Sequence, residues 1–384
     1  MGANFTVLGS SILSQQLNLH IQPLETQSTT LPFAERILIW FDQHGRKNLP
    51  WQENRSAYRV WISEIMLQQT QVNTVIPYFL KFMQTFPSLE SLANAEQDEV
   101  LKHWSGLGYY ARARNLHKAA QTIRDQHKGV FPDDLEAVIA LSGIGKSTAG
   151  AILSIAYQQK HAILDGNVKR VLARYYQVEG WTGSTAVQKQ LWEYAERLLP
   201  QQQPTQRNAD YTQAMMDLGA TLCTRSKPNC TACPLRSDCQ VFSTGQVQNY
   251  PKAKPKKKIP ERSAIMLILQ NKAGDVLLEK RPSVGIWGGL WSFPQFEQES
   301  QAGEWLLDYY ALELTQASLL PERMHTFSHF HLRIQPYLVQ IETVPSRVME
   351  ANHQLWYNTH TEFSGGLAAP ISYLLNTLKR KNTS

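Results

Sequence analysis

The chain has 384 residues, of which 42% are hydrophobic, and a formal net charge of +6. This length predicts two folded domains, and the positive charge favours a polyanionic partner such as nucleic acid. Because no apolar run reaches the roughly 18 residues of a membrane-spanning helix and the first residues lack a signal-peptide pattern, we expect no membrane association and a cytoplasmic protein.

Residues 1–30 are rich in Gln, Ser and Thr, and we expect a disordered tail there. From residue 31 the apolar residues recur at spacings of three and four, which predicts amphipathic helices. The clearest stripes begin at Ala34, Ile37, Leu38 and Phe41 and continue after Tyr58, Leu92, Asn115 and Ala149. We therefore predict an all-α domain over residues 31–249.

Glu64 stands within the apolar run Val60–Leu67. On a helix its carboxyl would have apolar neighbours on nearly every side, and desolvation raises the pKa of a carboxyl in such a place. A proton held near neutral pH would make Glu64 a general acid. The alternative is a purely structural residue, which a lone helical glutamate usually is.

The segment LSGIGKSTAGAILS, Leu141–Ser154, predicts two helices joined by a hairpin, with the second helix beginning near Lys146. Gly143 and Gly145 allow the turn to approach a partner closely, and the free N–H groups of the next helix favour a phosphate. One alternative is a nucleotide-binding P-loop, whose first glycine should stand where this chain has Ala140. The other is a plain helix-turn with no ligand.

Asp165 follows an apolar run and begins the next predicted helix. The helix dipole and free N–H groups favour a carboxylate there, so we expect Asp165 to be ionised. The alternative is an ordinary N-cap. A protonated acid with a second, ionised carboxylate suits cleavage through an oxocarbenium-like sugar, but sequence does not show that Glu64 and Asp165 converge.

All four cysteines fall in the pattern C-x6-C-x2-C-x5-C. Thiolates this close in sequence can enclose one metal centre, and both an iron-sulfur cluster and an all-cysteine zinc site fit the spacing. Unrelated buried thiols are the remaining alternative. Arg225, Ser226 and Lys227 lie in the first loop, which either meets a phosphate backbone or is a solvated basic loop. The cysteines are Cys223, Cys230, Cys233 and Cys239.

Residues 250–262, YPKAKPKKKIPER, combine three prolines with five lysines and predict a linker. Beyond it, short β-rich runs at 264–269, 276–278 and 332–341 predict a second, α+β domain over residues 263–384. The predicted fold class is therefore a multidomain chain, all-α followed by α+β.

With these features in place, the chain resembles the mismatch adenine DNA glycosylases (MutY family) within the helix-hairpin-helix glycosylases related to endonuclease III. The resemblance implies a [4Fe-4S] cluster at the four cysteines. It also implies that Glu64 protonates adenine as it leaves and that Asp165 stabilises the oxocarbenium ion. The blocks that carry it include SEIMLQQTQV (Ser63–Val72), GLGYYARARNLHKAA (Gly106–Ala120), ILDGNVKRVLAR (Ile163–Arg174), QAMMDLGA (Gln213–Ala220) and HTFSHFHL (His325–Leu332).

In this family the adenine is flipped out of the duplex into a pocket between helical subdomains. Several residues of this chain match the family's DNA contacts, and the resemblance implies that Gln68, Gln69, Thr70, Leu107 and Tyr109 wedge into the base stack and touch the base opposite the adenine. Without the resemblance, the apolar and aromatic ones would be interpreted as packing residues and the glutamines as a solvated helix face. The matching residues are Gln68, Gln69, Thr70, Leu107, Tyr109, Gly143, Gly145, Lys146, Ser147, Asn167 and Lys169.

Ser147 carries a separate expectation. Related enzymes that also cut the DNA strand have a lysine at this hairpin position, which forms a Schiff base that serine cannot form. Lys146 is adjacent but about 100° further round the helix. We therefore predict a glycosylase without strand-cleaving activity.

The segment Val276–Glu297 resembles the opening of a Nudix hydrolase domain. The following residues, Gln298–Leu314, lack the glutamate-rich REUXEE sequence that holds magnesium, so we expect recognition of 8-oxoguanine in place of hydrolysis. Phe327, Ser328 and His329 are the predicted contact. The alternative is a half-buried strand with His325, Phe327, His329 and His331 on one face.

Together these features predict a monomeric enzyme that acts on double-stranded DNA, with cytoplasmic, nucleoid-associated activity, and removes adenine paired with 8-oxoguanine or guanine. A non-catalytic lesion-binding module is the second hypothesis, and Glu64 and Asp165 argue against it. A thymine-glycol-type lyase is the third, and Ser147 argues against it.

Overall fold

The computed structural model describes residues 31–201, 207–255, 258–342 and 353–381. The predicted disordered tail, residues 1–30, lies outside these described ranges. By their contacts, residues 33–384 form one compact unit, which holds a helical domain followed by a sheet domain. In the described ranges, no helix is both long and apolar enough to cross a membrane.

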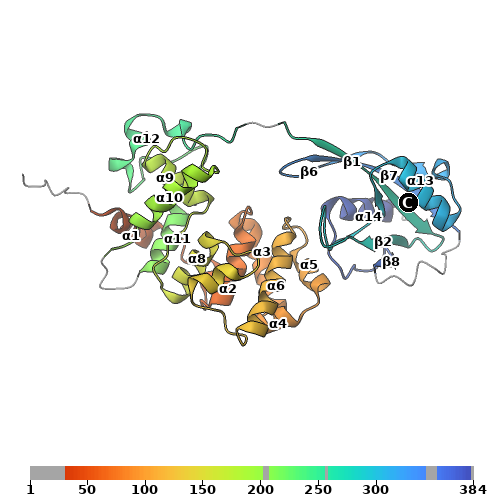
Figure 1. The fold of residues 1–384 in the computed structure, drawn as a ribbon, viewed down its shortest axis with the longest axis horizontal. Helices are drawn as coiled ribbons and strands as arrows, with labels where there is room; N and C mark the ends of the chain where they lie inside the picture. Colours follow the sequence, from red (N-terminus) through yellow and green to blue (C-terminus); the bar gives the residue numbers. More distant parts are fainter. Residues whose placement is uncertain (1–30, 202–206, 256–257, 343–352, 382–384) are drawn as a thin grey trace, which may run out of the picture. The chain divides into compact units, whose positions relative to one another are not determined.

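In the described residues of the first domain, the elements longer than a single bridge are all helices or helical turns, as predicted (Figure 1). Its helix α2 begins after Ser56, whose hydroxyl accepts a hydrogen bond from the backbone N–H of Arg59 and so caps the first turn. The helices are α1 (Phe33–His44), α2 (Ala57–Leu67), α3 (Val72–Thr85), α4 (Leu89–Asn94), α5 (Gln97–Trp104), α6 (Ala111–Gln126), α7 (Leu135–Ala140), α8 (Lys146–Tyr157), α9 (Gly166–Tyr175), α10 (Thr185–Arg197), α11 (Asn208–Asp217) and α12 (Gln240–Ser243). Short 3-10 or π turns are η1 (Pro50–Gln52), η2 (Leu218–Leu222), η3 (Arg236–Asp238) and η4 (Val247–Asn249).

The predicted helical hairpin is present between α7 and α8. Gly143 has a φ of +79°, a left-handed conformation that favours glycine, and a Cβ added there would lie 2.8 Å from the Cβ of Asn115. The element before the turn is a helix and not a strand, so this segment lacks the strand that precedes a P-loop.

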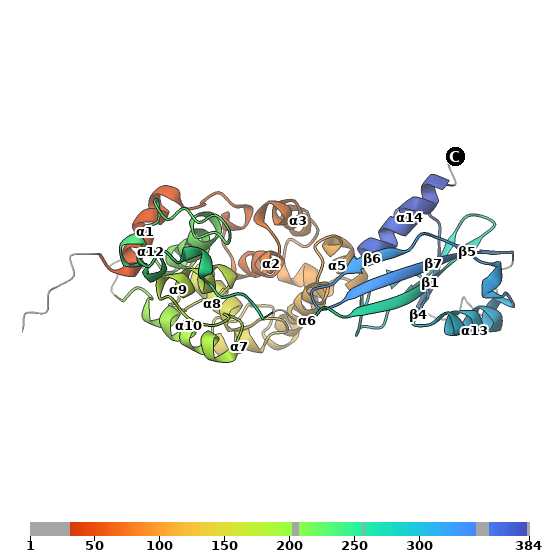
Figure 2. The ribbon, with the colours of Figure 1, turned by 90° about the horizontal axis from the view of Figure 1, so that it is seen from above.

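The second domain is built on a mixed sheet that β1 and β7 centre as a parallel pair (Figure 2). Alternate residues of β1 face opposite sides: Ile265 and Leu267 pack with α13, whereas Ala264 and Met266 pack with α14. The elements are β1 (Glu261–Asn271), β2 (Val276–Lys280), β3 (Trp291–Ser292), β4 (Gln295–Phe296), α13 (Glu299–Tyr310), η5 (Leu314–Gln316), β5 (Ser318–Leu319), β6 (Arg323–Thr326), β7 (His331–Ile341), β8 (Gln354–Tyr357) and α14 (Ala369–Lys381).

The first residues of the predicted linker are packed against the helical domain. Tyr250 is buried, its hydroxyl donates to the carboxylate of Glu179, and Lys252 forms an ion pair with the same carboxylate at 3.4 Å. A short β-bridge also joins Lys252 to Trp181.

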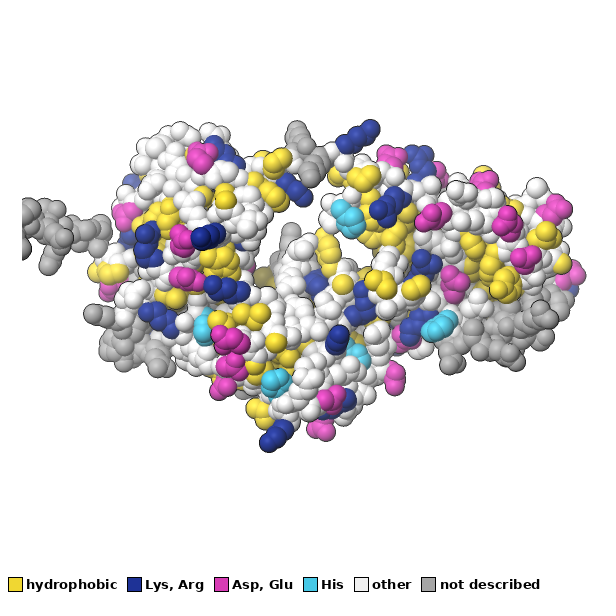
Figure 3. Space-filling view, viewed as in Figure 1, with side chains coloured by type: hydrophobic (Ala, Val, Ile, Leu, Met, Phe, Trp, Pro, Cys, Tyr) yellow, Lys and Arg dark blue, Asp and Glu magenta, His cyan; other side chains and the backbone are white. Residues whose placement is uncertain are grey.

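The net positive charge is not concentrated on the face shown in Figure 3. There, lysine and arginine side chains of the described residues are interspersed with acidic ones. Net charge alone therefore does not identify a DNA-binding surface on this face, and the site has to be found from its geometry.

Candidate active site

One cavity of about 580 Å³ brings together residues from distant parts of the helical domain. The carboxyl groups of Glu64, from α2, and Asp165, from the start of α9, both line it. The convergence that sequence could not show is therefore present. The predicted residues that line this cavity are Glu64, Gln68, Thr70, Ser147, Asp165 and Asn167.

Glu64 is half-buried and opens onto the cavity from an otherwise apolar helix. Desolvation, reinforced by the negative charge of Asp165, raises the pKa of Glu64 from 4.5 to about 8. A carboxyl with this pKa carries a proton at neutral pH. The rise in the pKa of Glu64 that its apolar neighbours predicted is confirmed.

Asp165 is the N-cap of α9, as its position predicted. One carboxyl oxygen accepts a 2.8 Å hydrogen bond from the backbone N–H of Val168, and the other accepts a 3.1 Å bond from the side chain of Asn167. Burial nevertheless raises the pKa of Asp165, and its effect exceeds the lowering by these bonds and by the charge of Arg170. The sequence argument included the helix terminus but not the burial, so the direction that it implied for the pKa of Asp165 is wrong.

Ser147 and Lys146 point to different partners. The Ser147 hydroxyl accepts a 2.9 Å hydrogen bond from the backbone N–H of Leu164, the residue before Asp165. The Lys146 ammonium lies 2.7 Å from a carboxylate oxygen of Glu196 and 4.5 Å from the ring centre of Trp192. Lys146 is therefore held by α10 and does not line the cavity.

Two turns carry a further group of the predicted DNA contacts of this domain. We call residues Gln68–Thr70 the glutamine turn and residues Gly106–Tyr109 the wedge turn. Gln69 and Tyr109 have left-handed φ values of 61° and 50°. Leu107 is buried, whereas Tyr109 is 49% exposed. Of these two side chains, only that of Tyr109 is accessible to a ligand.

The remaining predicted DNA contacts lie outside the cavity lining. Gly143 and Gly145 are exposed in the hairpin. The Lys169 ammonium donates a 3.2 Å hydrogen bond to the side chain of Gln188 and points toward α10.

Arg170 was missed by the sequence analysis although it lines the cavity. Its guanidinium donates to the side chain of Asn167 at 2.8 Å, and to the backbone carbonyls of Gly219 and Cys223 at 2.7 Å each. Asn167 in turn holds Asp165, so a continuous set of hydrogen bonds joins the carboxylate to the cysteine loop. The only sequence signal was its place in the ILDGNVKRVLAR block.

Two further cavity residues were also missed. Arg46 holds the fully buried carboxylate of Asp217 through its backbone N–H at 2.8 Å and its guanidinium at 2.6 Å. Gln213 donates to the same carboxylate at 2.9 Å. These bonds fix one wall of the cavity, and Gln213 is the first residue of the QAMMDLGA block.

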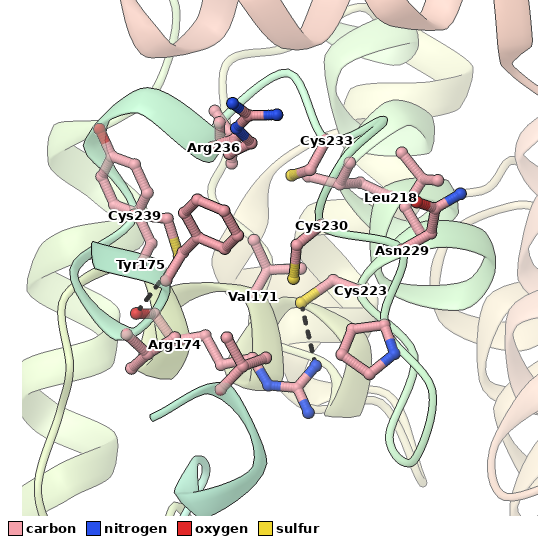
Figure 4. Close-up of a pocket in the computed structure, with 16 residues that line it drawn as sticks. Val171, Arg174, Tyr175, Leu218, Cys223, Asn229, Cys230, Cys233, Arg236 and Cys239 are labelled. Carbon is pink, nitrogen blue, oxygen red and sulfur yellow. Dashed lines mark hydrogen bonds between the residues drawn. The ribbon is translucent and has the colours of Figure 1, made fainter. Parts of the chain in front are cut away.

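The four cysteines are free thiols that line a second cavity (Figure 4). Burial raises the pKa of Cys230, of Cys239 and of Cys233, the last to about 12. Arg174, almost fully buried, donates to the sulfur of Cys223 at 3.3 Å. In the described ranges, no set of three or more His, Cys, Asp or Glu side chains is arranged to hold a metal ion.

Phe327, Ser328 and His329 form the turn between β6 and β7, because β6 ends at Thr326. Ser328 and His329 are exposed. The Phe327 ring stacks on the Phe330 ring, with ring centres 4.5 Å apart, and packs against the Trp287 ring, with ring centres 5.9 Å apart. The alternative of a continuous half-buried strand through these residues is wrong, since the chain turns there.

Residues 62–197 match the family model described as HhH-GPD superfamily base excision DNA repair protein, and residues 264–377 match the NUDIX domain. A thermostable thymine-DNA glycosylase of known structure has a TM-score of 0.50 and 28% identity, and the match covers 55% of this chain and 95% of that one. The fold and the buried carboxylates thus define a base-excision DNA glycosylase.

Relatives narrow this class. Adenine DNA glycosylase of Buchnera aphidicola from Acyrthosiphon pisum is 39% identical over 348 residues, which cover 91% of this chain and 98% of the relative. The Homo sapiens adenine DNA glycosylase is 35% identical over 371 residues, covering 81% of this chain and 67% of the relative. The chain belongs to the adenine DNA glycosylase family.

Proposed function

We propose that the protein hydrolyses the N-glycosidic bond of adenine paired with 8-oxoguanine or guanine in double-stranded DNA and leaves an abasic site. The observation that carries this proposal is the meeting of Glu64 and Asp165 in one cavity. Its volume, about 580 Å³, is ample for a flipped nucleotide. Family membership supports adenine as the base.

Glu64 supplies the proton. It donates to a ring nitrogen of adenine, so the electrons of the breaking glycosidic bond move onto a base that leaves in neutral form. Asp165, in its carboxylate form, stabilises the positive sugar electrostatically. Water then adds to the sugar carbon and loses a proton, which restores the acid form of Glu64. The ion pair between Arg46 and Asp217 keeps this part of the cavity wall rigid.

Cys223, Cys230, Cys233 and Cys239 are the proposed ligands of a [4Fe-4S] cluster. Four thiolates fit either zinc or such a cluster, and the resemblance to endonuclease III-related glycosylases favours the cluster. When bound, the cluster supplies a rigid cross-link of the loop.

Arg174 also fits a negatively charged group at this place. Its guanidinium is buried, and its hydrogen-bond acceptors are the Cys223 sulfur and the carbonyls of Thr224, Arg225 and Tyr250. A buried cation is costly without a nearby anion, and cluster-bound thiolates provide one. Iron and sulfide analysis of the purified chain tests the assignment: four irons per chain are expected, and stoichiometric zinc would refute it.

The turn Phe327–His329 is the proposed reader of 8-oxoguanine. The packed ring of Phe327 holds the turn, while the exposed side chains of Ser328 and His329 offer hydrogen-bonding groups to a base edge. The protein acts as a monomer in this proposal, since both the acid and the reader belong to one chain.

The experiment is single-turnover base release from duplexes with adenine opposite 8-oxoguanine, guanine or thymine. Free adenine is measured by chromatography for the native chain, Asp165→Asn and Ser328→Ala. We expect release opposite 8-oxoguanine and guanine, a loss of at least about 1,000-fold in Asp165→Asn, and a reduced preference for 8-oxoguanine over guanine in Ser328→Ala. Equal release opposite thymine, or an active Asp165→Asn, would refute the proposal.

A further inference from the structure

Arg112 lies where the glutamine turn and the wedge turn meet the end of α2, the helix that carries Glu64. It is the second residue of α6, three residues after the end of the wedge turn, and its side chain is half-buried. Its guanidinium has five N–H donors in a fixed plane, so it can hold several separate segments in one geometry.

One end of the guanidinium caps the helix that carries Glu64. The Nη1 group of Arg112 donates to the backbone carbonyls of Ile65 at 2.8 Å, Met66 at 3.0 Å and Gln68 at 2.5 Å. The last carbonyls of a helix have no partner within the helix and carry partial negative charge. Arg112 satisfies them at the end of α2, one turn from Glu64.

The other end holds the wedge turn. The Nη2 group donates to the carbonyls of Leu107 and Gly108, both at 3.2 Å, and to the hydroxyl of Thr70 at 3.4 Å. The same guanidinium lies 5.6 Å from the ring centre of Tyr109. Arg112 therefore contacts both the wedge turn and the glutamine turn.

The character of these bonds suggests positioning as their role. Their acceptors are backbone carbonyls and one hydroxyl, with no carboxylate among them, so Arg112 holds backbone segments in place and forms no ion pair in these bonds. Burial lowers the pKa of Arg112 to about 10, which leaves it charged at neutral pH. The charged guanidinium therefore keeps every N–H group that donates to the two turns.

Both turns need such support. Gln69 and Tyr109 adopt left-handed backbone conformations, which are unfavourable for a non-glycine residue and persist only where the surroundings fix them. Arg112 forms hydrogen bonds within both turns.

We propose that Arg112 is a positioning residue that couples opening of the duplex to the acid: it makes the wedge turn, the glutamine turn and the end of α2 one rigid unit, so that wedging by the exposed Tyr109 delivers the adenine to Glu64. The inference rests on the proposed function and adds the residue that links base extrusion to chemistry. Lysine cannot replace Arg112, because a single ammonium cannot reach both sets of carbonyls.

The test compares Arg112→Lys on two substrates. One is an intact duplex with adenine opposite 8-oxoguanine, in which the base must be extruded. The other carries the same adenine opposite a one-nucleotide gap, in which the base has no pairing partner and is extruded at a lower cost. We expect single-turnover release to fall about 100-fold on the duplex and less than about fivefold on the gapped substrate.

A second readout follows extrusion itself. With 2-aminopurine beside the target adenine, native protein should raise fluorescence on binding as the stack opens, and Arg112→Lys should not, at equal occupancy. Gly108→Ala provides a second variant that strains the wedge turn, since Gly108 has a φ of +71°, without contact with α2. Its single-turnover release should also fall more on the intact duplex than on the gapped substrate.

Arg59→Lys is the matched control. Arg59 is also half-buried, donates to the carbonyls of Glu53 at 3.1 Å and Pro50 at 2.7 Å, and lies 5.2 Å from the Phe79 ring centre. Because it touches neither turn, any loss in Arg59→Lys should be equal on the two substrates.

The outcomes separate the two proposals. If native protein releases no adenine from either substrate, the proposed function fails. If native protein is active and Arg112→Lys loses the same factor on both substrates, or none on either, the coupling role is wrong. Gly108→Ala decides the same question if Arg112→Lys does not fold, as judged by circular dichroism.

Discussion

The hydroxyl of Ser147 accepts a hydrogen bond from the backbone N–H of Leu164, so the start of α8 is tied to the residue directly before Asp165. We predict that Ser147→Ala, which removes this bond, slows single-turnover adenine release about 2- to 10-fold. That range corresponds to the roughly 0.5 to 1.5 kcal/mol of one neutral hydrogen bond. An unchanged rate would mean that the bond does not position Asp165.

Ser147→Lys addresses strand cleavage. We predict that borohydride traps no covalent complex between the native chain and an abasic duplex, because Lys146 is held by Glu196. The Ser147→Lys variant should gain measurable trapping, since its new amine extends from a residue that lines the cavity. Efficient trapping by the native chain would contradict the assignment of a glycosylase without lyase activity.

The pH profile follows from the acid. Because the pKa of Glu64 is about 8, its protonated form persists through neutral pH and is lost above it. We predict that the single-turnover rate falls as pH rises through about 8 and approaches a tenfold loss per pH unit beyond. A rate that declined already near pH 5 would show that Glu64 titrates normally.

The same carboxyl affects stability. Because its pKa is raised in the folded protein, Glu64 binds more protons there than in the unfolded chain between pH 4.5 and 8. Its contribution to the free energy of unfolding is therefore full below pH 4.5 and is lost as the pH rises toward 8. Glu64→Gln does not titrate. In urea unfolding, the native chain should lose up to about 1.4 kcal/mol per pH unit relative to Glu64→Gln across this window. Parallel curves for the two proteins would contradict this.

Gly219→Ala tests the hydrogen bonds that hold Asp165. A Cβ at Gly219 would lie 2.5 Å from the Cβ and 3.0 Å from the Cα of Asn167, so the first turn of α9 must shift. We expect about a 100-fold slower release, the loss that a displacement of about 1 Å can cause. Gly303→Ala, whose added carbon meets only Leu314 at 3.8 Å, should leave the rate unchanged. Equal rates for both variants would show that Asn167 does not position Asp165.

The elements that sequence predicted well are those fixed by local pattern. The hairpin follows from Gly143 and Gly145, and the start of α9 follows from Asp165, since caps and turns depend on neighbouring residues. The strands β1 and β7 follow from their apolar runs, although their parallel pairing does not.

What sequence missed depends on contacts between distant segments. Arg112 donates to the carbonyl of Gln68, 44 residues earlier, and Arg170 to that of Cys223, 53 residues later. A backbone carbonyl is present at every position, so nothing in the residue types marks such an acceptor. The burial of Asp165 likewise depends on how α8, α9 and η2 close around it.

The central claim is that Glu64 delivers the proton that releases adenine. The most direct measurement is single-turnover release from a duplex with adenine opposite 8-oxoguanine by Glu64→Gln, whose amide fits the same volume but cannot donate an acidic proton. We predict a loss of at least about 1,000-fold with DNA affinity changed less than about threefold, consistent with general acid catalysis. Release by Glu64→Gln at the native rate would contradict the account.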